Sequence, residues 1–161
     1  MDAWVNKLIE TLGLKPHPEG GCFVETFRSP LLVTPADARG QRSALTVIYF
    51  LLMHGVCSRW HRVRSDEAWH WYEGSALELL TARPEGGSIC RVSLGPLSEG
   101  SAPSHVVPAG WWQAARPLGN YALVGCSVGP GFEFADFTLL STIPETERPA
   151  FDPVSALLEF L

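Results

Sequence analysis

Residues 55–74 read GVCSRWHRVRSDEAWHWYEG and contain two runs rich in β-branched and aromatic residues, Ser58–Arg64 and Glu67–Glu73. Such runs are typical of β-strands. Because alternate residues of a strand share a face, the two strands are predicted to direct His61 and Glu67 into one interior. A buried carboxylate beside an imidazole shifts the protonation of both groups toward a range useful for chemistry.

The chain on either side of this stretch consists of short runs of the same kind, separated by turn residues. No connection between the runs has room for a crossover helix, so parallel βαβ units are excluded. An all-β antiparallel barrel or sandwich is therefore predicted. The further predicted strands are Cys22–Arg28, Ser43–Met53, Leu77–Ala82, Ser88–Leu94, His105–Val107, Trp111–Ala115, Tyr121–Val128 and Glu133–Leu140.

Both ends of the chain show apolar residues at helical spacing and predict a short helix. At the N-terminal end Asp2 is the expected N-cap and Gly13 the expected stop. At the C-terminal end Asp152 is the expected N-cap and Pro153 the first helical position.

One domain accounts for the whole chain of 161 residues, of which 46% are hydrophobic. No internal repeat and no Ser-, Gly- or Pro-rich linker divides it. We expect a barrel over residues 17–140, with the helices at residues 1–13 and 152–161.

Composition also excludes several kinds of partner. The formal net charge is −5 and the basic residues form no run, so nucleic acid is not expected as a partner. The longest apolar run, Val47–Met53, is far short of the ~20 residues that a membrane helix needs, and the N-terminus has no leader pattern. We therefore expect a cytoplasmic protein, with its four singly placed cysteines present as reduced, packed thiols.

Residues 55–74 resemble the first motif of the cupin superfamily. The positions that match are Gly55, His61, Glu67 and Gly74. In the superfamily this cluster commonly holds a metal ion.

Two ligand positions depart from that pattern. Val63 replaces the second histidine of the first motif, and Gln113 stands where the second motif has its histidine. A neutral amide oxygen is a weak ligand for Fe, Mn, Ni or Zn, so no cofactor is favoured. A divalent metal would need His70 or His105 as a substitute ligand, and ideal strand parity turns His70 away from Glu67 unless a bulge redirects it.

Further segments narrow the resemblance to one cupin family, DUF985, also called cupin 5. The resemblance implies a double-stranded β-helix that forms a homodimer, but it implies no reaction. Glycines and prolines of His17–Gly21 and Gly129–Gly131 are interpreted as conformational, because they permit tight turns. The segments are His17–Gly21, Glu25–Ser29, Ile48–Leu52, Val106–Gly110 and Gly129–Phe137.

The candidate catalytic residues are His61, Glu67 and Tyr49. By analogy with cupin epimerases, His61 is the general base, Glu67 orients it and Tyr49 is the acid. Each has a structural alternative: a hydrogen bond inside a polar barrel for His61, a salt bridge to Arg62 or Arg64 for Glu67, and a core position for Tyr49.

The candidate binding residues are basic, aromatic or amide side chains placed near the motif. Arginine suits a carboxylate or phosphate group, and the tryptophans would form a stacking wall. The residues are Arg28, Arg59, Trp69, Trp71, His70, His105 and Gln113.

Three hypotheses for function follow. The first is a metal-independent epimerase or isomerase acting on a small polar, sugar-like substrate. The second is a metal-dependent cupin oxygenase or isomerase. The third is a module that binds a small-molecule metabolite without transforming it.

Overall fold

The computed structural model describes residues 3–161 and begins with helix α1 (Ala3–Leu12). Gly13, with a φ of +66°, ends the helix as expected, because glycine adopts this left-handed conformation without strain. The expected N-cap, Asp2, lies outside the described residues. Val5 and Leu8 of the helix are buried against the outer face of a sheet, where they contact a cluster that includes Leu51.

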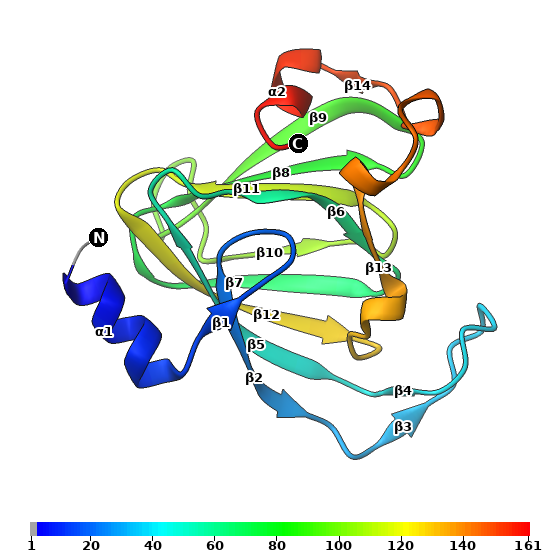
Figure 1. Cartoon of the computed structure of the whole chain (residues 1–161), viewed down its shortest axis with the longest axis horizontal. Coiled ribbons are helices and arrows are strands. Elements are labelled where there is room, and N and C mark those ends of the chain that lie inside the picture. The colour runs from blue at the N-terminus through cyan, green and yellow to red at the C-terminus, as the bar shows by residue number, and fades with distance from the viewer. Residues whose placement is uncertain (1–2) are drawn as a thin grey trace.

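Two six-stranded sheets face each other and form the barrel (Figure 1). The first sheet has the order β1 (Lys15–Pro16), β2 (Cys22–Arg28), β5 (Thr46–Met53), β12 (Tyr121–Gly129), β7 (Asp66–Gly74), β10 (Ser104–Val107). The second has the order β13 (Phe137–Leu139), β6 (Ser58–Val63), β11 (Trp112–Pro117), β8 (Leu77–Arg83), β9 (Gly86–Leu94), β14 (Phe151–Asp152).

The pairings confirm an antiparallel all-β fold. The short strand β14 is an addition that runs parallel to β9. A separate hairpin of β3 (Leu32–Val33) and β4 (Arg42–Ser43) extends away from the barrel in Figure 1. Neither helix of the described chain is long and apolar enough to cross a membrane.

The strands predicted between Cys22 and Val128 are confirmed, with boundaries that shift by up to three residues. The strand predicted over Glu133–Leu140 is only partly correct. Its first half is the 3₁₀ helix η1 (Phe134–Asp136), and β13 supplies three residues before a second 3₁₀ helix, η2 (Leu140–Thr142). The turn at η1 carries the buried carboxylate of Asp136, which pairs with arginines rather than continuing a strand.

At the C-terminal end the elements begin and end at other residues than expected. Asp152 belongs to β14, Pro153 is the N-cap, and helix α2 covers only Val154–Leu158. A third 3₁₀ helix, η3 (Glu145–Glu147), precedes it.

All four cysteines are free, but Cys90 is exposed, so that thiol is not packed as expected.

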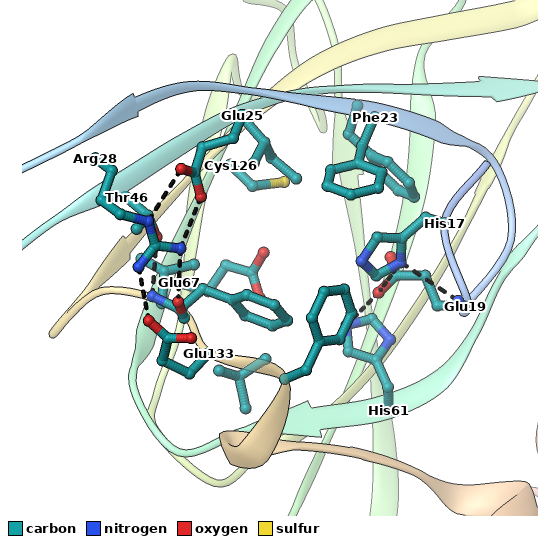
Figure 2. Close-up of a pocket in the computed structure, with 16 residues that line it drawn as sticks. His17, Glu19, Phe23, Glu25, Arg28, Thr46, His61, Glu67, Cys126 and Glu133 are labelled. Atoms are coloured by element: carbon teal, nitrogen blue, oxygen red, sulfur yellow. Dashed lines mark hydrogen bonds and ion pairs between the residues drawn. The ribbon is translucent and has the colours of Figure 1, made fainter. Parts of the chain in front are cut away.

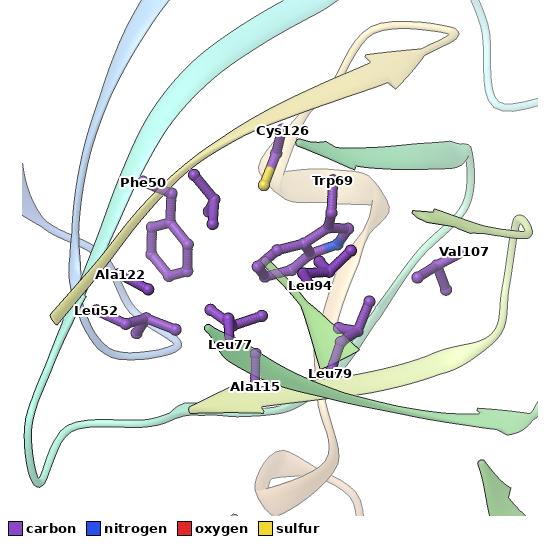
Figure 3. Packing of buried hydrophobic residues seen from close by; sticks show 11 residues of the cluster. Phe50, Leu52, Trp69, Leu77, Leu79, Leu94, Val107, Ala115, Ala122 and Cys126 are labelled. Carbon is purple, nitrogen blue, oxygen red and sulfur yellow. The ribbon is translucent and has the colours of Figure 1, made fainter. Parts of the chain in front are cut away.

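The side chains that point into the barrel differ between its two ends. Apolar side chains of seven strands fill one end, including Leu52, Trp69 and Leu79, none of which is exposed (Figure 3). Phe50 and Cys126 belong both to this apolar cluster and to the lining of a pocket. They therefore mark the level at which the filled end of the barrel meets the open end.

The filled end is expected to carry much of the stability. Replacing the fully buried Leu79 by Ala should lower the free energy of unfolding by about 2–5 kcal/mol, because it removes buried methyl groups and leaves a cavity. Urea unfolding measures this. Leu97→Ala, at a side chain that is 83% exposed, is the matched control and should change stability by less than about 0.5 kcal/mol. Equal effects of the two changes would contradict this division of the interior.

Candidate functional site

The open end of the barrel is a pocket of about 680 Å³, open solvent at its mouth included (Figure 2). Strands β2, β5, β6, β7 and β12 supply most of its wall, and residues 17–19 and 132–134 complete it. Figure 2 shows His17, Glu19 and His61 on one side, and Glu25, Arg28 and Glu133 on the opposite side. The polar groups therefore form two separate clusters with apolar wall between them.

His61 is 2% exposed and has a defined tautomer. Its Nδ1 lies 2.8 Å from the backbone carbonyl oxygen of Arg59, and a carbonyl oxygen only accepts hydrogen bonds, so Nδ1 carries the proton. In the neutral ring Nε2 therefore holds a lone pair. That atom lies 3.4 Å from Oε2 of Glu19. The carboxylate at this distance from His61 is Glu19, which the sequence did not indicate. The expected partner, Glu67, interacts with His61 electrostatically and opposes the lowering of the His61 pKa by burial.

Glu19 is buried, and desolvation raises its pKa to about 7, against opposing effects of His17, Ser58 and Arg59. Ser58 Oγ donates a hydrogen bond to Glu19 Oε1 at 2.8 Å. Burial also lowers the pKa of His61. A deprotonated Glu19 and a neutral His61 would place two lone pairs against each other, so the favourable state of this pair has a proton on one of the two groups.

The loop that carries Glu19 is fixed to strand β6. The backbone N–H of Arg59 donates to the carbonyl oxygen of Glu19 at 2.8 Å, and the Arg59 guanidinium donates to the carbonyl oxygen of Pro18. The backbone N–H of Glu19 donates to Nδ1 of His17 at 3.3 Å, which occupies that nitrogen's lone pair. Gly20 makes the turn with a φ of +114°, where any Cβ would overlap the carbonyl oxygen of Cys57.

Glu67 enters the pocket from β7 and is held from behind. Nε2 of Gln113 donates to Oε2 of Glu67 at 2.5 Å, and Oε1 of the same amide accepts from Trp69 Nε1 at 2.9 Å. All three side chains are buried. Desolvation raises the pKa of Glu67, although His61 and the Gln113 hydrogen bond oppose the shift. Burial also raises the pKa of the adjacent Cys126 thiol well above its ordinary range.

The mouth of the pocket is built around Arg28. Its Nε and Nη2 donate to the two carboxylate oxygens of Glu25 at 3.0 and 2.8 Å. Nη1 donates to Glu133 at 2.8 Å, and Nη2 also donates to the carbonyl oxygen of Phe132 at 3.2 Å. The guanidinium is therefore largely satisfied by the protein itself.

Of the residues singled out from the sequence, His61, Glu67 and Arg28 line the pocket. Gln113 and Trp69 lie behind Glu67 and orient it. Neither structural alternative for Glu67 is found: Arg62 lies over the Trp112 ring and Arg64 pairs with Asp37.

The remaining candidates lie outside the pocket lining. Arg59 fastens the loop rather than facing the cavity. Tyr49 packs among the residues beneath α1, with its ring centroid 5.9 Å from that of Tyr72. It lies there because Ile48 and Phe50, its neighbours on β5, occupy the inward face. Trp71 Nε1 donates to a turn carbonyl oxygen.

His70 and His105 complete that set. His70 lies opposite Gly125 of β12 and Ser104 of β10, and neighbours the inward-facing Trp69 along β7. Pleat parity therefore turns His70 to the outer face, as expected. His105 is opposite Trp69 on the edge strand β10, where partial burial lowers its pKa.

Sequence reasoning missed His17 and Glu19 as members of the site. Both stand in the segment His17–Gly21, whose glycines and proline were interpreted as conformational. That interpretation holds for Gly20, yet the same turn places two ionisable side chains in the pocket. The available signal was that His17 and Glu19 flank Pro18 inside a tight turn.

The residues present do not fit the metal site that the superfamily pattern suggests. Gln113 presents its NH₂ group to Glu67 and its oxygen to Trp69, so the amide offers no ligand atom. Nδ1 of His61 carries a proton, and Nδ1 of His17 accepts a hydrogen bond from the backbone N–H of Glu19, so neither atom can bind a metal ion. Among residues 3–161 no group of three or more His, Cys, Asp or Glu side chains is arranged to hold a metal ion.

Two facing antiparallel sheets closed around a pocket define the class of small-molecule barrels built as a double-stranded β-helix. The chain belongs to the DUF985 family of the cupin superfamily. The model of this family matches residues 6–140. A search of curated proteins finds no match.

Solved structures agree with this assignment. A hypothetical protein from Leishmania major is 31% identical, with a TM-score of 0.77 over 83% of this chain and 85% of that one. A protein from Shewanella oneidensis is 34% identical, with a TM-score of 0.76 over 86% and 84%. A Bacillus subtilis oxalate decarboxylase variant is 13% identical, with a TM-score of 0.56 over 78% of this chain and 30% of that one, a likeness of fold alone.

The raised pKa of Glu19 has a consequence for stability. Its pKa is about 7 in the folded protein and near the ordinary 4.5 when unfolded. Protonated Glu19 therefore favours folding at low pH, and this contribution is lost as the pH rises through 7. Relative to Glu19→Gln, which does not titrate, the wild type should lose about 3 kcal/mol of unfolding free energy between about pH 5 and about pH 8.

Urea unfolding of both proteins across that pH range measures the difference. Both proteins keep the two buried imidazoles, but only the wild type has the Glu19 carboxylate that raises the pKa of His17. The difference between the profiles therefore reports Glu19 together with its coupling to His17. Parallel stability profiles for the two proteins would show that Glu19 has an ordinary pKa.

Proposed function

We propose that this protein is a metal-independent enzyme of the epimerase or isomerase type, which moves a proton on a small polar, sugar-like molecule bound in the pocket. One observation carries the proposal: Nε2 of His61 and Oε2 of Glu19 are buried in the pocket 3.4 Å apart. An acid whose pKa is about 7 can both give and take a proton at neutral pH.

His61 is the general base of the proposed reaction. Its Nδ1–H is fixed on the carbonyl oxygen of Arg59, so Nε2 is the atom that takes a proton from carbon next to a substrate carbonyl. The electron pair of the broken C–H bond moves to the carbonyl oxygen and gives an enolate. Glu19 stabilises the imidazolium formed and exchanges its own proton with it.

Glu67 replaces Tyr49 as the proposed acid, because Tyr49 lies on the outer face of the sheet whereas Glu67 lines the pocket. Its raised pKa favours the protonated form that can return a proton to the enolate. Return to the same carbon from the other face gives an epimer, and return to the neighbouring carbon gives an isomer. Gln113 positions Glu67, and the apolar wall excludes water.

Deuterium exchange tests the proposal while the substrate is still unidentified. The protein is incubated in D₂O with a panel of hydroxy-aldehydes, hydroxy-ketones and amino and neutral sugars, and mass spectrometry measures uptake at carbon-bound positions. We expect uptake into at least one compound. Removing one acid–base partner by Glu19→Gln or His61→Asn should slow it by about 10²–10⁴-fold.

Tyr49→Phe is the control and should keep the wild-type exchange rate, since its hydroxyl lies outside the pocket. Circular dichroism checks that each variant is folded. Full exchange in folded Glu19→Gln and His61→Asn proteins would contradict the assignment. A compound that binds in the pocket but returns unlabelled would favour a binding module instead.

A further inference from the structure

The pocket holds far more acid than base. Four carboxyl groups line it, against the single guanidinium of Arg28. The four carboxyl groups belong to Glu19, Glu25, Glu67 and Glu133. The two imidazoles add no positive charge at neutral pH, because burial lowers the pKa of both. The electrostatic potential of this cavity is therefore unfavourable to an anion.

Arg28 does not reverse this balance. Four hydrogen bonds to Glu25, Glu133 and the carbonyl oxygen of Phe132 use four of its five N–H groups. A carboxylate or phosphate that approached Arg28 would face both glutamates, which lie 2.8 Å from its nitrogens. The role in anion binding expected from the sequence therefore has little support from the surroundings of Arg28.

We propose that the pocket selects a cationic small molecule, one with a protonated amine or another onium group on a compact body. This inference rests on the proposed function only in assigning the same pocket to the substrate. It adds the charge class of the ligand, which the proton-transfer chemistry leaves open.

The aromatic rings of the apolar wall also favour a cation. Aromatic rings run along it from the mouth inward: Phe132 and Phe134 have centroids 5.1 Å apart, Phe134 stacks on His17 at 5.9 Å, and His17 meets Phe23 at 4.6 Å. The faces of aromatic rings attract cations, most strongly where water is excluded. Carboxylates at both ends of an aromatic wall suit an ammonium group on an apolar or ring-shaped body.

Proton linkage distinguishes a cation from an anion in this pocket. A positive charge beside Glu67 or Glu19 stabilises the carboxylate form and lowers the pKa of these acids, so that binding releases a proton. An anion would instead require them to stay protonated. The titratable and charged groups around the cavity are His17, Glu19, Glu25, Arg28, His61, Glu67, Cys126 and Glu133.

Three probes of similar size and different charge test the inference: benzylammonium, benzyl alcohol and benzoate. Calorimetry and protein-observed NMR at neutral pH and low salt measure their dissociation constants. Benzylammonium should bind about tenfold more tightly than benzyl alcohol, and benzoate more weakly than either. Calorimetry in buffers of different ionisation enthalpy should show proton release with benzylammonium.

Matched variants assign the effect to the pocket. Glu67→Gln and the double change Glu25→Gln with Glu133→Gln should each reduce the preference for benzylammonium over benzyl alcohol several-fold. Glu85→Gln is the control, since its side chain is 70% exposed and lies outside the pocket, and should leave the preference unchanged. Shifts in NMR resonances of residues that line the pocket locate each probe.

The inference is overturned if benzoate binds as tightly as benzylammonium, if none of the probes binds at millimolar concentrations, or if the preference survives both pocket variants. These outcomes are separate from those of the exchange experiment. Cation preference without deuterium exchange would contradict only the proposed reaction, whereas exchange into anionic compounds with tight benzoate binding would contradict only the charge class.

Discussion

The strand pleat is the constraint on which this barrel depends, because every second side chain must point into a limited interior. On β5, the inward positions run from Thr46 through Ile48 and Phe50 to Leu52, from pocket to packed core. On β7 the same alternation carries Glu67 into the pocket and Trp69 into the core. Strands β5 and β7 therefore each contribute to stability at one end and to the site at the other.

The burial that stabilises the fold creates the chemistry of the site. Ionisable groups placed inside lose their hydration and must gain a partner. The partner of Glu67 is the Gln113 amide, which Trp69 of the core holds in place. The partners of Glu19 are the Ser58 hydroxyl, which donates a hydrogen bond, and the nearby imidazoles of His17 and His61. The pKa values of Glu19 and Glu67 are raised because these protein partners replace only part of the water that would solvate the two carboxylates.

Loss of the superfamily's metal ligands fits the same account. Where an imidazole would present a lone pair, Gln113 donates a hydrogen bond to Glu67, which partly offsets the desolvation that raises the pKa of this carboxyl group. Val63 adds an apolar surface to the pocket wall. The arrangement supports the proposed proton transfer by side chains and, with its excess of carboxyl groups, the proposed recognition of a cation.

Several features followed from the sequence alone, because they depend on local pattern. Alternation and turn residues predicted the antiparallel barrel. The spacing of Gly55, His61, Glu67 and Gly74 indicated the cupin superfamily and two residues of the pocket, and further segments indicated the family. Pleat parity also turned His70 outward correctly. These inferences need only the order of residues along one or two strands.

Only the tertiary structure decided which distant residues complete the site. Glu19 meets His61 because a loop 42 residues earlier in the chain is tied to β6 by Arg59, a contact that no local pattern encodes. Arg28 and Glu133 meet across the mouth although 105 positions separate them. Such pairings depend on strand order and register, and burial then sets the proton affinities that give the residues their chemistry.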